Sequence, residues 1–284
     1  MSIPVPDDLM PQVERALAED LGAGDLTAAL IPADLRGRAS VITREPAILC
    51  GRPYVEASFR ALDPGVRIDW HVAEGEQAHA DQLLFVVAGF ARALLSAERT
   101  ALNFLQLLSA TATAAHRYAA LVEGTGCRVL DTRKTLPGLR TAQKYAVRVG
   151  GAQNHRIGLF DGVLIKENHI MAAGSIAAAV ARAKALPNPP RIEVEVETLA
   201  ELREAIAAGA DVALLDNFPL TDLRAAVAIN RSAGKPLLLE ASGGVSLDTV
   251  QAIAATGVDF VSVGAMTKHV SAVDLSMRFE WNAA

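Results

Sequence analysis

The chain has 284 residues and a formal net charge of −5, with 51% hydrophobic and 5% aromatic residues. This composition can bury a large core, so it excludes a disordered chain, and the acidic balance with few aromatics disfavours nucleic-acid binding. The longest apolar run, residues 83–95, is broken by Arg92 and is shorter than the about 20 residues that span a bilayer, so we expect no membrane segment.

Helices and short strands alternate irregularly over the first 90 residues. Residues 7–21 and 54–62 carry apolar residues at helical spacing, whereas residues 38–44, 47–50, 66–72 and 83–87 are typical of strands. These elements predict a small α+β layer. The N-terminus lacks the basic and apolar regions of a secretory signal, and Cys50 and Cys127 are far apart, so we expect a cytoplasmic protein with two free thiols.

A long helix is predicted from about residue 90 to residue 123, a stretch without proline or glycine. Leucines recur along one side of it, and Arg99 falls near a different side. At this point two readings of Arg99 are open, because a single arginine in such a helix often extends its charge to solvent or pairs locally, and it can also serve a site.

After Gly124 six apolar strands alternate with amphipathic helices. The strands are expected at residues 127–131, 162–166, 192–196, 212–216, 236–240 and 260–264, and the helices between the later strands at residues 174–186, 198–209, 220–234 and 246–257. Continuous apolar strands separated by helices are typical of parallel βα units. Six such units predict an α/β fold with an incomplete barrel rather than an open sheet.

The stretch from residue 131 to residue 169 reverses the charge of the chain. It contains seven basic residues against three acidic ones, and two histidines in addition. A concentrated positive field inside an acidic protein indicates a site for a small, highly charged anion.

The predicted strands end in polar residues of two chemistries, at the face where βα barrels build their sites. The cationic group, suited to carboxylates and phosphates, comprises Arg133, Lys134, His155, Arg156 and Lys166. Glu195 and Asp216 are oxygen donors that suit Mg²⁺, which is often held by one or two carboxylates and substrate phosphates. Because Glu193, Glu195 and Glu197 alternate with apolar residues, they are costly to bury unless paired, and we expect at least Glu195 to meet the cations.

Glycines follow the last two strands. Ser242, Gly243 and Gly244 stand between a strand and a helix, where backbone N–H groups can approach a phosphate, and Gly264 to Lys268 repeat the arrangement. A loop without a ligand would explain residues 242–244 about as well as a phosphate site would. Two adjacent strand–loop–helix junctions of this kind favour phosphate binding.

The motifs resemble one family over nearly the whole chain. DTRKTLPGLR (131–140), KYAVRVGGAQNHRIGLFDGVLIKENH (144–169), LEASGGVS (239–246) and VSVGAMTKHVSAVDLSMRF (261–279) are similar to the quinolinate phosphoribosyltransferases. The resemblance implies an enzyme, nicotinate-nucleotide diphosphorylase (carboxylating), of NAD biosynthesis. It would convert quinolinate and phosphoribosyl pyrophosphate into nicotinate mononucleotide, pyrophosphate and CO₂, with Mg²⁺ as cofactor.

The resemblance also implies an architecture. It predicts an N-terminal α/β sandwich domain with a connecting helix (1–115), an open α/β barrel (116–270) and a C-terminal segment (271–284) that packs back on the first domain. Members of the family form homodimers with shared active sites.

Residue roles follow by motif. Quinolinate would contact Arg133, His155, Arg156 and Lys166, with Arg99 supplied by the partner subunit. Lys134, Glu195 and Asp216 would be catalytic, with Mg²⁺ held mainly through the substrate near Glu195 and Asp216. The residues expected at phosphoribosyl pyrophosphate are Lys134, Glu195, Asp216, Ser242, Gly243, Gly264 and Lys268. Some members of the family carry histidine where this chain has Lys268.

Two other functions are compatible with parts of this pattern. A relative that has drifted to another substrate need not keep all five cations, and this chain keeps them. A nucleic-acid-binding or general anion-binding module is disfavoured by the acidic pI of about 5.7 and by the absence of a basic stripe.

Overall fold

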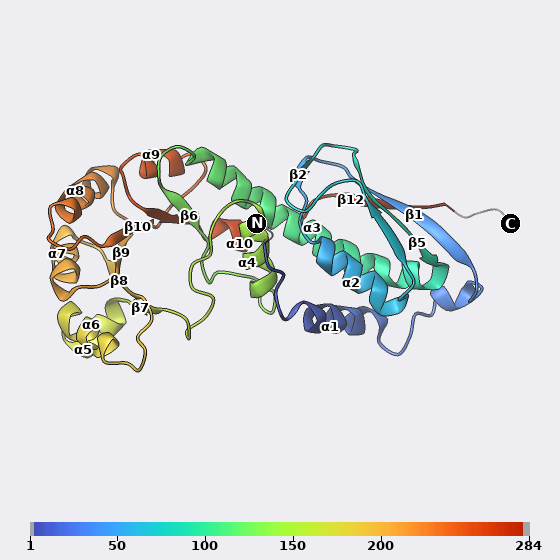
Figure 1. Ribbon diagram of the computed structural model, residues 1–284, viewed down its shortest axis with the longest axis horizontal. Helices are drawn as coiled ribbons and strands as arrows, with labels where there is room; N and C mark the ends of the chain where they lie inside the picture. Colours follow the sequence, from blue (N-terminus) through green and yellow to red (C-terminus); the bar gives the residue numbers. More distant parts are fainter. Residues whose placement is uncertain (1–2, 281–284) are drawn as a thin grey trace. The chain divides into compact units, whose positions relative to one another are not determined.

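The computed structural model describes residues 3–280, which form two compact units. The first comprises residues 3–116, 136–151 and 266–280, and the second comprises residues 117–135 and 152–265. Figure 1 shows both units and labels most of their helices and strands. None of the described helices is both long and apolar enough to cross a membrane.

The first unit combines an antiparallel sheet with helices. Its elements are α1 (Leu9–Leu21), the 3-10 helix η1 (Ala28–Leu30), β1 (Arg36–Thr43), β2 (Ala47–Ile48), α2 (Arg52–Leu62), β3 (Arg67–Trp70), β4 (Gln77–Ala78), β5 (Leu83–Phe90), α3 (Ala91–Leu121), α4 (Arg140–Val149), α10 (Ala265–Lys268) and β12 (Leu275–Glu280). The four-stranded sheet has the order β12-β1-β5-β3, and β2 pairs with β4. Helix α3 continues into the second unit.

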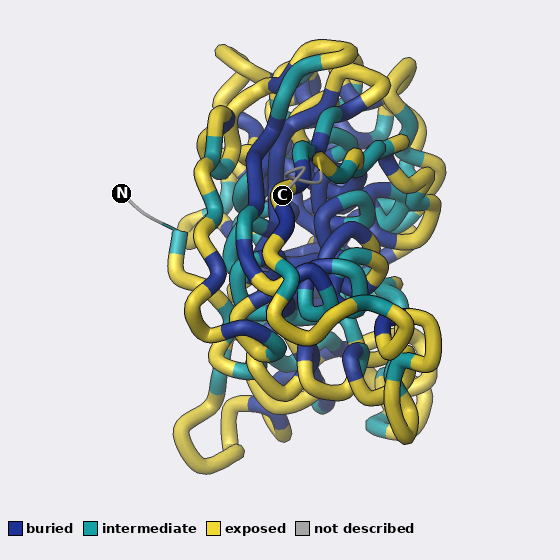
Figure 2. The backbone as a smooth tube through the Cα atoms, turned by 90° about the vertical axis from the view of Figure 1, so that its right-hand side faces the viewer, coloured by how far each residue is buried: buried dark blue, intermediate teal, exposed yellow. Residues whose placement is uncertain are grey.

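Two apolar clusters hold this unit together. One lies between the sheet and the helices α2 and α3, and includes Val41, Phe59, Phe85 and Leu105. The predicted strands and helices of this region are confirmed, because the apolar positions that suggested them are buried; β1, for example, alternates between exposed and buried residues. In Figure 2 the buried positions are dark blue and the exposed loops yellow.

The second cluster shows that residues 136–151 group differently from our expectation. We predicted residues 116–270 as one barrel domain, but Ala142, Tyr145 and Ala146 of α4 are buried with α1 residues such as Val13. This apolar face of α4 explains why the segment belongs to the first unit. The C-terminal segment joins the same unit through β12, which pairs with β1; residues 281–284 lie outside the described residues.

The second unit contains the predicted βα repeats. Its elements are β6 (Arg128–Leu130), β7 (Val163–Ile165), α5 (Glu167–Ala173), α6 (Ile176–Lys184), β8 (Ile192–Val196), α7 (Leu199–Ala208), β9 (Val212–Asp216), α8 (Leu220–Arg231), β10 (Leu238–Ser242), α9 (Val250–Ala254) and β11 (Phe260–Ser262). All six strands pair in parallel in the order β6-β11-β10-β9-β8-β7. Helices α5 to α9 lie outside the sheet (Figure 1).

The sheet of the second unit curls into an open barrel. Gln153 pairs in parallel with Leu130 at the outer edge of β6, so residues 152–155 extend the sheet there. Five strand spacings separate that edge from β8, about 24 Å in a flat sheet. The imidazole of His155 nevertheless reaches Glu193 of β8, with 2.8 Å between Nε2 and Oε2. Only a curled sheet allows this contact.

Three α-helices and the 3-10 helix η1 were not predicted, and one helix was predicted too long. Helices α4 and α5 lie in the charged stretch and have only ten and seven residues, and α10 has four residues. The helix expected at residues 246–257 is α9, which begins only at Val250 because residues 247–249 form a turn. Cys50 and Cys127 are buried free thiols, as expected.

A glycine-to-alanine pair tests the packing of α4 against α3. A Cβ at Gly150 would lie 2.2 Å from the carbonyl oxygen of Ala112, although φ is −73° and the backbone would accept alanine. We expect Gly150→Ala to lower the free energy of unfolding by about 1–3 kcal/mol. In the control Gly234→Ala the new Cβ meets nothing within 4 Å. Denaturant unfolding of both variants provides the measurement, and equal midpoints would contradict the close packing.

Candidate active site

The parallel register brings charged residues together at the carboxyl ends of the strands. Leu164 of β7 pairs with Glu193 of β8, so Lys166 and Glu195 fall at the same level two residues later. Their side chains form an ion pair in which the lysine is more exposed than the glutamate. The expectation that Glu195 meets a cation is therefore confirmed.

The next two strands place Asp216 beside the serine of the glycine loop. Asp216 and Ser242 are Cα partners across β9 and β10. The N–H of Asn217 donates to the Ser242 carbonyl at 2.9 Å, and its side-chain amide donates to Oδ2 of Asp216 at 2.8 Å. Both Asp216 and Ser242 are half-buried, so they border solvent at the strand ends.

The loop after β10 needs its glycines. Gly243 has φ +93° and Gly244 has φ +60°, and a Cβ at Gly243 would lie 2.1 Å from Oδ1 of Asn217. Both glycines are exposed. Because α9 starts six residues after Gly244, any phosphate contact would use the N–H groups of this loop rather than those of a helix N-terminus.

Gly264 after β11 lies against Lys134. A Cβ there would lie 3.1 Å from Cδ of Lys134 and 3.3 Å from Oγ1 of Thr132. The Thr132 hydroxyl in turn accepts the N–H of Lys134 at 3.0 Å. The glycine thus leaves room for the aliphatic part of a lysine whose side chain is exposed at this edge.

The positive charge of Arg133 acts on Arg156, another member of the cationic group. Burial lowers the pKa of Arg156 from its ordinary value, and the positive charge of Arg133 lowers it further, while Glu193 and Asp161 oppose the shift. Nη1 of Arg156 donates to the carbonyl of Gly162 at 3.0 Å. Two neighbouring guanidinium groups form a strongly positive region suited to an anion with two carboxylates.

His155 is fixed on every side by neighbouring groups. The backbone N–H of His155 donates to Oδ1 of the fully buried Asp131 at 2.8 Å. The side-chain amide of Asn154 donates to the other oxygen of that carboxylate at 2.7 Å. Nδ1 of the ring accepts the N–H of Arg156 at 2.8 Å, and Nε2 faces Glu193.

Two buried glutamates face this ring from inside the barrel. Nε2 lies 2.8 Å from Oε2 of Glu193 and 3.6 Å from Oε2 of Glu240, and the two glutamates are only 6% and 2% exposed. Burial raises the pKa of Glu240 to about 8, and the neighbouring carboxylate of Glu193 adds to the rise. A cavity of about 320 Å³ borders all three side chains.

The remaining two predicted site residues, Arg99 and Lys268, belong to the first unit, and both are exposed. Arg99 is exposed on α3, whereas Leu94 and Leu102 of the same helix are buried, which confirms that Arg99 falls outside the apolar side. Lys268 ends α10.

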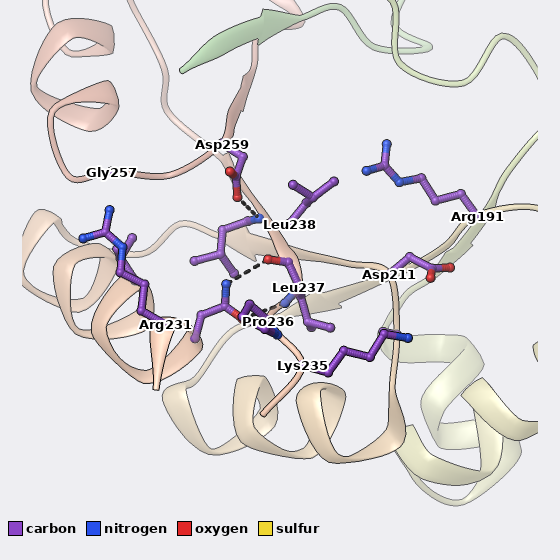
Figure 3. Close-up of a pocket in the computed structure, with 13 residues that line it drawn as sticks. Arg191, Asp211, Arg231, Lys235, Pro236, Leu237, Leu238, Gly257 and Asp259 are labelled. Atoms are coloured by element: carbon purple, nitrogen blue, oxygen red, sulfur yellow. Dashed lines mark hydrogen bonds between the residues drawn. The ribbon is translucent and has the colours of Figure 1, made fainter. Parts of the chain in front are cut away.

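A second cavity lies at the opposite, amino-terminal ends of the strands (Figure 3). It has a volume of about 750 Å³ and is bordered by the exposed cations Arg191, Arg231 and Lys235. Its carboxylates already bond to the sheet, because Asp211 accepts the N–H of Ile192 and Asp259 that of Leu239, each at 2.8 Å. These acids stabilise strand ends, and none of the predicted site residues borders this cavity.

The sequence reasoning did not single out the residues that support the site. Asp131, Asn154 and Thr132 orient the loops, and Glu240 faces His155 from a strand that otherwise looks apolar. Glu240 could have been found from its position, because burying a carboxylate inside an apolar strand is costly unless the carboxylate has a partner.

Together the fold and the site define an α/β protein whose barrel-like unit presents cations, carboxylates and a glycine loop at one edge. Family models for the N-terminal and C-terminal domains of quinolinate phosphoribosyl transferase match residues 25–109 and 111–278. The chain belongs to the quinolinate phosphoribosyl transferase family.

Individual relatives agree with this assignment. The chain is 41% identical to the probable nicotinate-nucleotide pyrophosphorylase (carboxylating) of Synechocystis, covering 96% of this chain and 92% of the relative. It is also 41% identical to the corresponding protein of Mycobacterium leprae, covering 93% and 95%. Among solved structures, the nicotinate-nucleotide pyrophosphorylase from Francisella tularensis is similar with a TM-score of 0.93 and 48% identity, covering 98% of each chain.

The raised pKa of Glu240 predicts a pH dependence of stability. A folded-state pKa of about 8, against an ordinary value of 4.5, means that the folded protein keeps a proton that the unfolded chain releases. The resulting stabilisation is complete below about pH 4.5 and is lost as the pH rises through about 8, with a slope of at most about 1.4 kcal/mol per pH unit.

We expect Glu240→Gln, which cannot ionise, to flatten this dependence. Denaturant unfolding of both proteins between pH 5 and pH 9 measures the difference. Parallel stability curves for the two proteins would show that Glu240 is ionised throughout.

Proposed function

We propose that this chain transfers the phosphoribosyl group of phosphoribosyl pyrophosphate to quinolinate, and that nicotinate mononucleotide, pyrophosphate and CO₂ are the products, in NAD biosynthesis. The observation that carries the proposal is the grouping of Lys166, Glu195 and Asp216 at one sheet edge, with Arg133 and Arg156 in the same unit.

The cations select the dicarboxylate. Quinolinate carries two carboxylates on a pyridine ring, and guanidinium groups bind carboxylates through paired hydrogen bonds. We assign this role to Arg133 and Arg156, with Lys166 as a point charge that leaves its partner Glu195 when the substrate arrives. His155, whose ring nitrogens contact Glu193 and the Arg156 N–H, lines the same pocket.

The carboxylates serve the sugar. When the bond between C1 and the pyrophosphate oxygen breaks, positive charge develops at C1, and the negative charges of Glu195 and Asp216 stabilise it. The quinolinate nitrogen forms the new bond to C1. Lys134 lies between the two substrates, and the loop of Ser242 and Gly243, with Gly264 and Lys268, binds the phosphates.

The transferred sugar prepares the loss of CO₂. Once bonded to C1, the ring nitrogen is positively charged and accepts the electron pair released when the 2-carboxylate leaves. A proton then takes the place of the carboxylate on the ring. No side chain acts as a covalent nucleophile in this sequence.

Mg²⁺ fits the residues present. Glu195 and Asp216 are half-buried carboxylates on adjacent strands, and Mg²⁺ is often bound by one or two carboxylates together with substrate phosphates. When bound, the ion neutralises the charge of the departing pyrophosphate.

The proposal includes a cytoplasmic homodimer with shared sites. Arg99 is exposed on α3, where it is available to a second subunit, and two free cysteines suit a reducing compartment. In the dimer, Arg99 of the partner subunit completes the quinolinate pocket.

Turnover tests the central step. With quinolinate, phosphoribosyl pyrophosphate and Mg²⁺, we expect nicotinate mononucleotide and CO₂ in equal amounts. Lys166→Ala should lower kcat/KM about ten- to a hundredfold, because a hydrogen bond to a charged group is lost. The matched control is Lys235→Ala at the opposite strand ends. Equal turnover of nicotinate, or none of quinolinate, would contradict the proposal.

Mixed dimers test the shared site. Arg99→Ala and Lys134→Ala should each be inactive alone, but a dimer with one subunit of each kind contains one intact site. Random exchange between equal amounts should therefore restore about a quarter of the wild-type activity. Absence of recovery, with subunit exchange confirmed by mass spectrometry, would mean that each site is built from one chain.

A further inference from the structure

The carboxyl groups of Glu193 and Glu240 are buried inside the barrel next to His155 and outside the strand-end site. They come from β8 and β10, and together with Nε2 of His155 their oxygens lie within 4.8 Å of one another. Oε1 of each glutamate has no hydrogen-bond partner among the described residues. Burying two such carboxyl groups is costly, so their retention beside the ring calls for an explanation.

A divalent metal is the first candidate, since a histidine and two carboxylates are common ligands. The hydrogen bonds of the ring argue against it. Nδ1 accepts the N–H of Arg156, so Nδ1 carries no proton, and we assign the proton of the neutral ring to Nε2. A protonated Nε2 has no lone pair for a metal, but it donates well to the carboxylate of Glu193 at 2.8 Å.

The ring therefore connects the glutamates to an arginine of the proposed quinolinate pocket. On one side Nε2 is anchored by Glu193, with Glu240 at 3.6 Å. On the other side Nδ1 fixes the backbone N–H of Arg156, whose guanidinium lies near the like charge of Arg133. Because like charges repel, a fixed backbone is needed to keep both guanidinium groups aimed at one substrate.

We propose that Glu193, with Glu240 beside it, is a positioning residue for the dicarboxylate substrate: Glu193 holds the His155 ring, and the ring holds Arg156. This inference rests on the proposed function. It assigns to the middle of the barrel a role in substrate selection, whereas the residues at the strand ends contact the substrate themselves.

Three variants separate positioning from folding. Glu193→Leu removes the acceptor for Nε2, whereas Glu193→Gln keeps an acceptor oxygen. Asp259→Asn is the matched control, because Asp259 is another acid at a strand of this unit but bonds to Leu239 rather than to His155.

We expect Glu193→Leu to raise the KM for quinolinate at least about tenfold, the change that follows loss of a hydrogen bond to a charged group. The KM for phosphoribosyl pyrophosphate should stay within about twofold, because its proposed contacts lie elsewhere. Glu193→Gln and Asp259→Asn should both keep the KM for quinolinate within about threefold of the wild type. A purely structural role would move both KM values and the unfolding midpoint together, and that result would overturn the proposal.

Should Glu193→Leu fail to fold, the double variant Glu193→Leu/Glu240→Leu provides the same test. Replacing both buried acids with apolar groups of similar volume is often neutral or stabilising. Its affinity for quinolinate alone, measured by calorimetry, should fall at least about tenfold. Wild-type affinity in this variant would overturn the proposal.

Metal analysis of the substrate-free wild type distinguishes the other candidate. One tightly bound divalent ion per chain, lost in the double variant, would show a metal site instead and overturn the positioning role. The wild type is the reference throughout: if it neither binds nor converts quinolinate, the proposed function fails, whereas normal wild-type activity with unaffected variants refutes only the positioning role.

Discussion

The candidate site depends on the curl of the parallel sheet in the second unit, which is marked by the hydrogen bond between His155 and Glu193. This bond joins the segment beside β6 to β8, five strand positions away, across the interior of the sheet. A flat sheet would keep these residues about 24 Å apart. The contact thus marks the curl that turns six parallel strands into an open barrel, and the curl brings all their carboxyl ends around one opening.

Parallel pairing then determines which residues meet at that opening. Lys166 and Glu195 lie at the same level of the sheet because of the parallel register of β7 and β8. Asp216 lies beside Ser242 because of the parallel register of β9 and β10. The site consequently has two chemically different parts. In the proposed function, the cations that follow the early strands bind the dicarboxylate, whereas the acids and glycines that follow the later strands serve the sugar, the metal and the phosphates.

Much of this arrangement could be predicted from the sequence. The six strands were visible as apolar runs, and the ion pair of Glu195 followed from the cost of an unpaired carboxylate inside a barrel. The charged stretch was harder, because its residues 136–151 form α4 and pack in the first unit, while residues 131–135 and 152–169 belong to the second. The charge pattern does not indicate this division. The apolar face formed by Ala142, Tyr145 and Ala146 does indicate it, but that helix has only ten residues.

The partners of His155 could not be predicted for a different reason. Glu193 and Glu240 are 47 positions apart in the chain, and they meet only because the sheet curls. Motif spacing reports neighbours along one element, whereas this contact depends on the tertiary closure of the barrel. The same limit applies to the orientation of the ring, which depends on Arg156 N–H and on Asp131.

A crystal structure with quinolinate bound tests the central claim most directly. We expect the two carboxylates of the ligand at the carboxyl edge of the sheet, within hydrogen-bond distance of Arg133, Arg156 or Lys166, with Lys166 released from Glu195. Quinolinate bound instead in the cavity near Arg191, Arg231 and Lys235, at the amino-terminal ends of the strands, would contradict it.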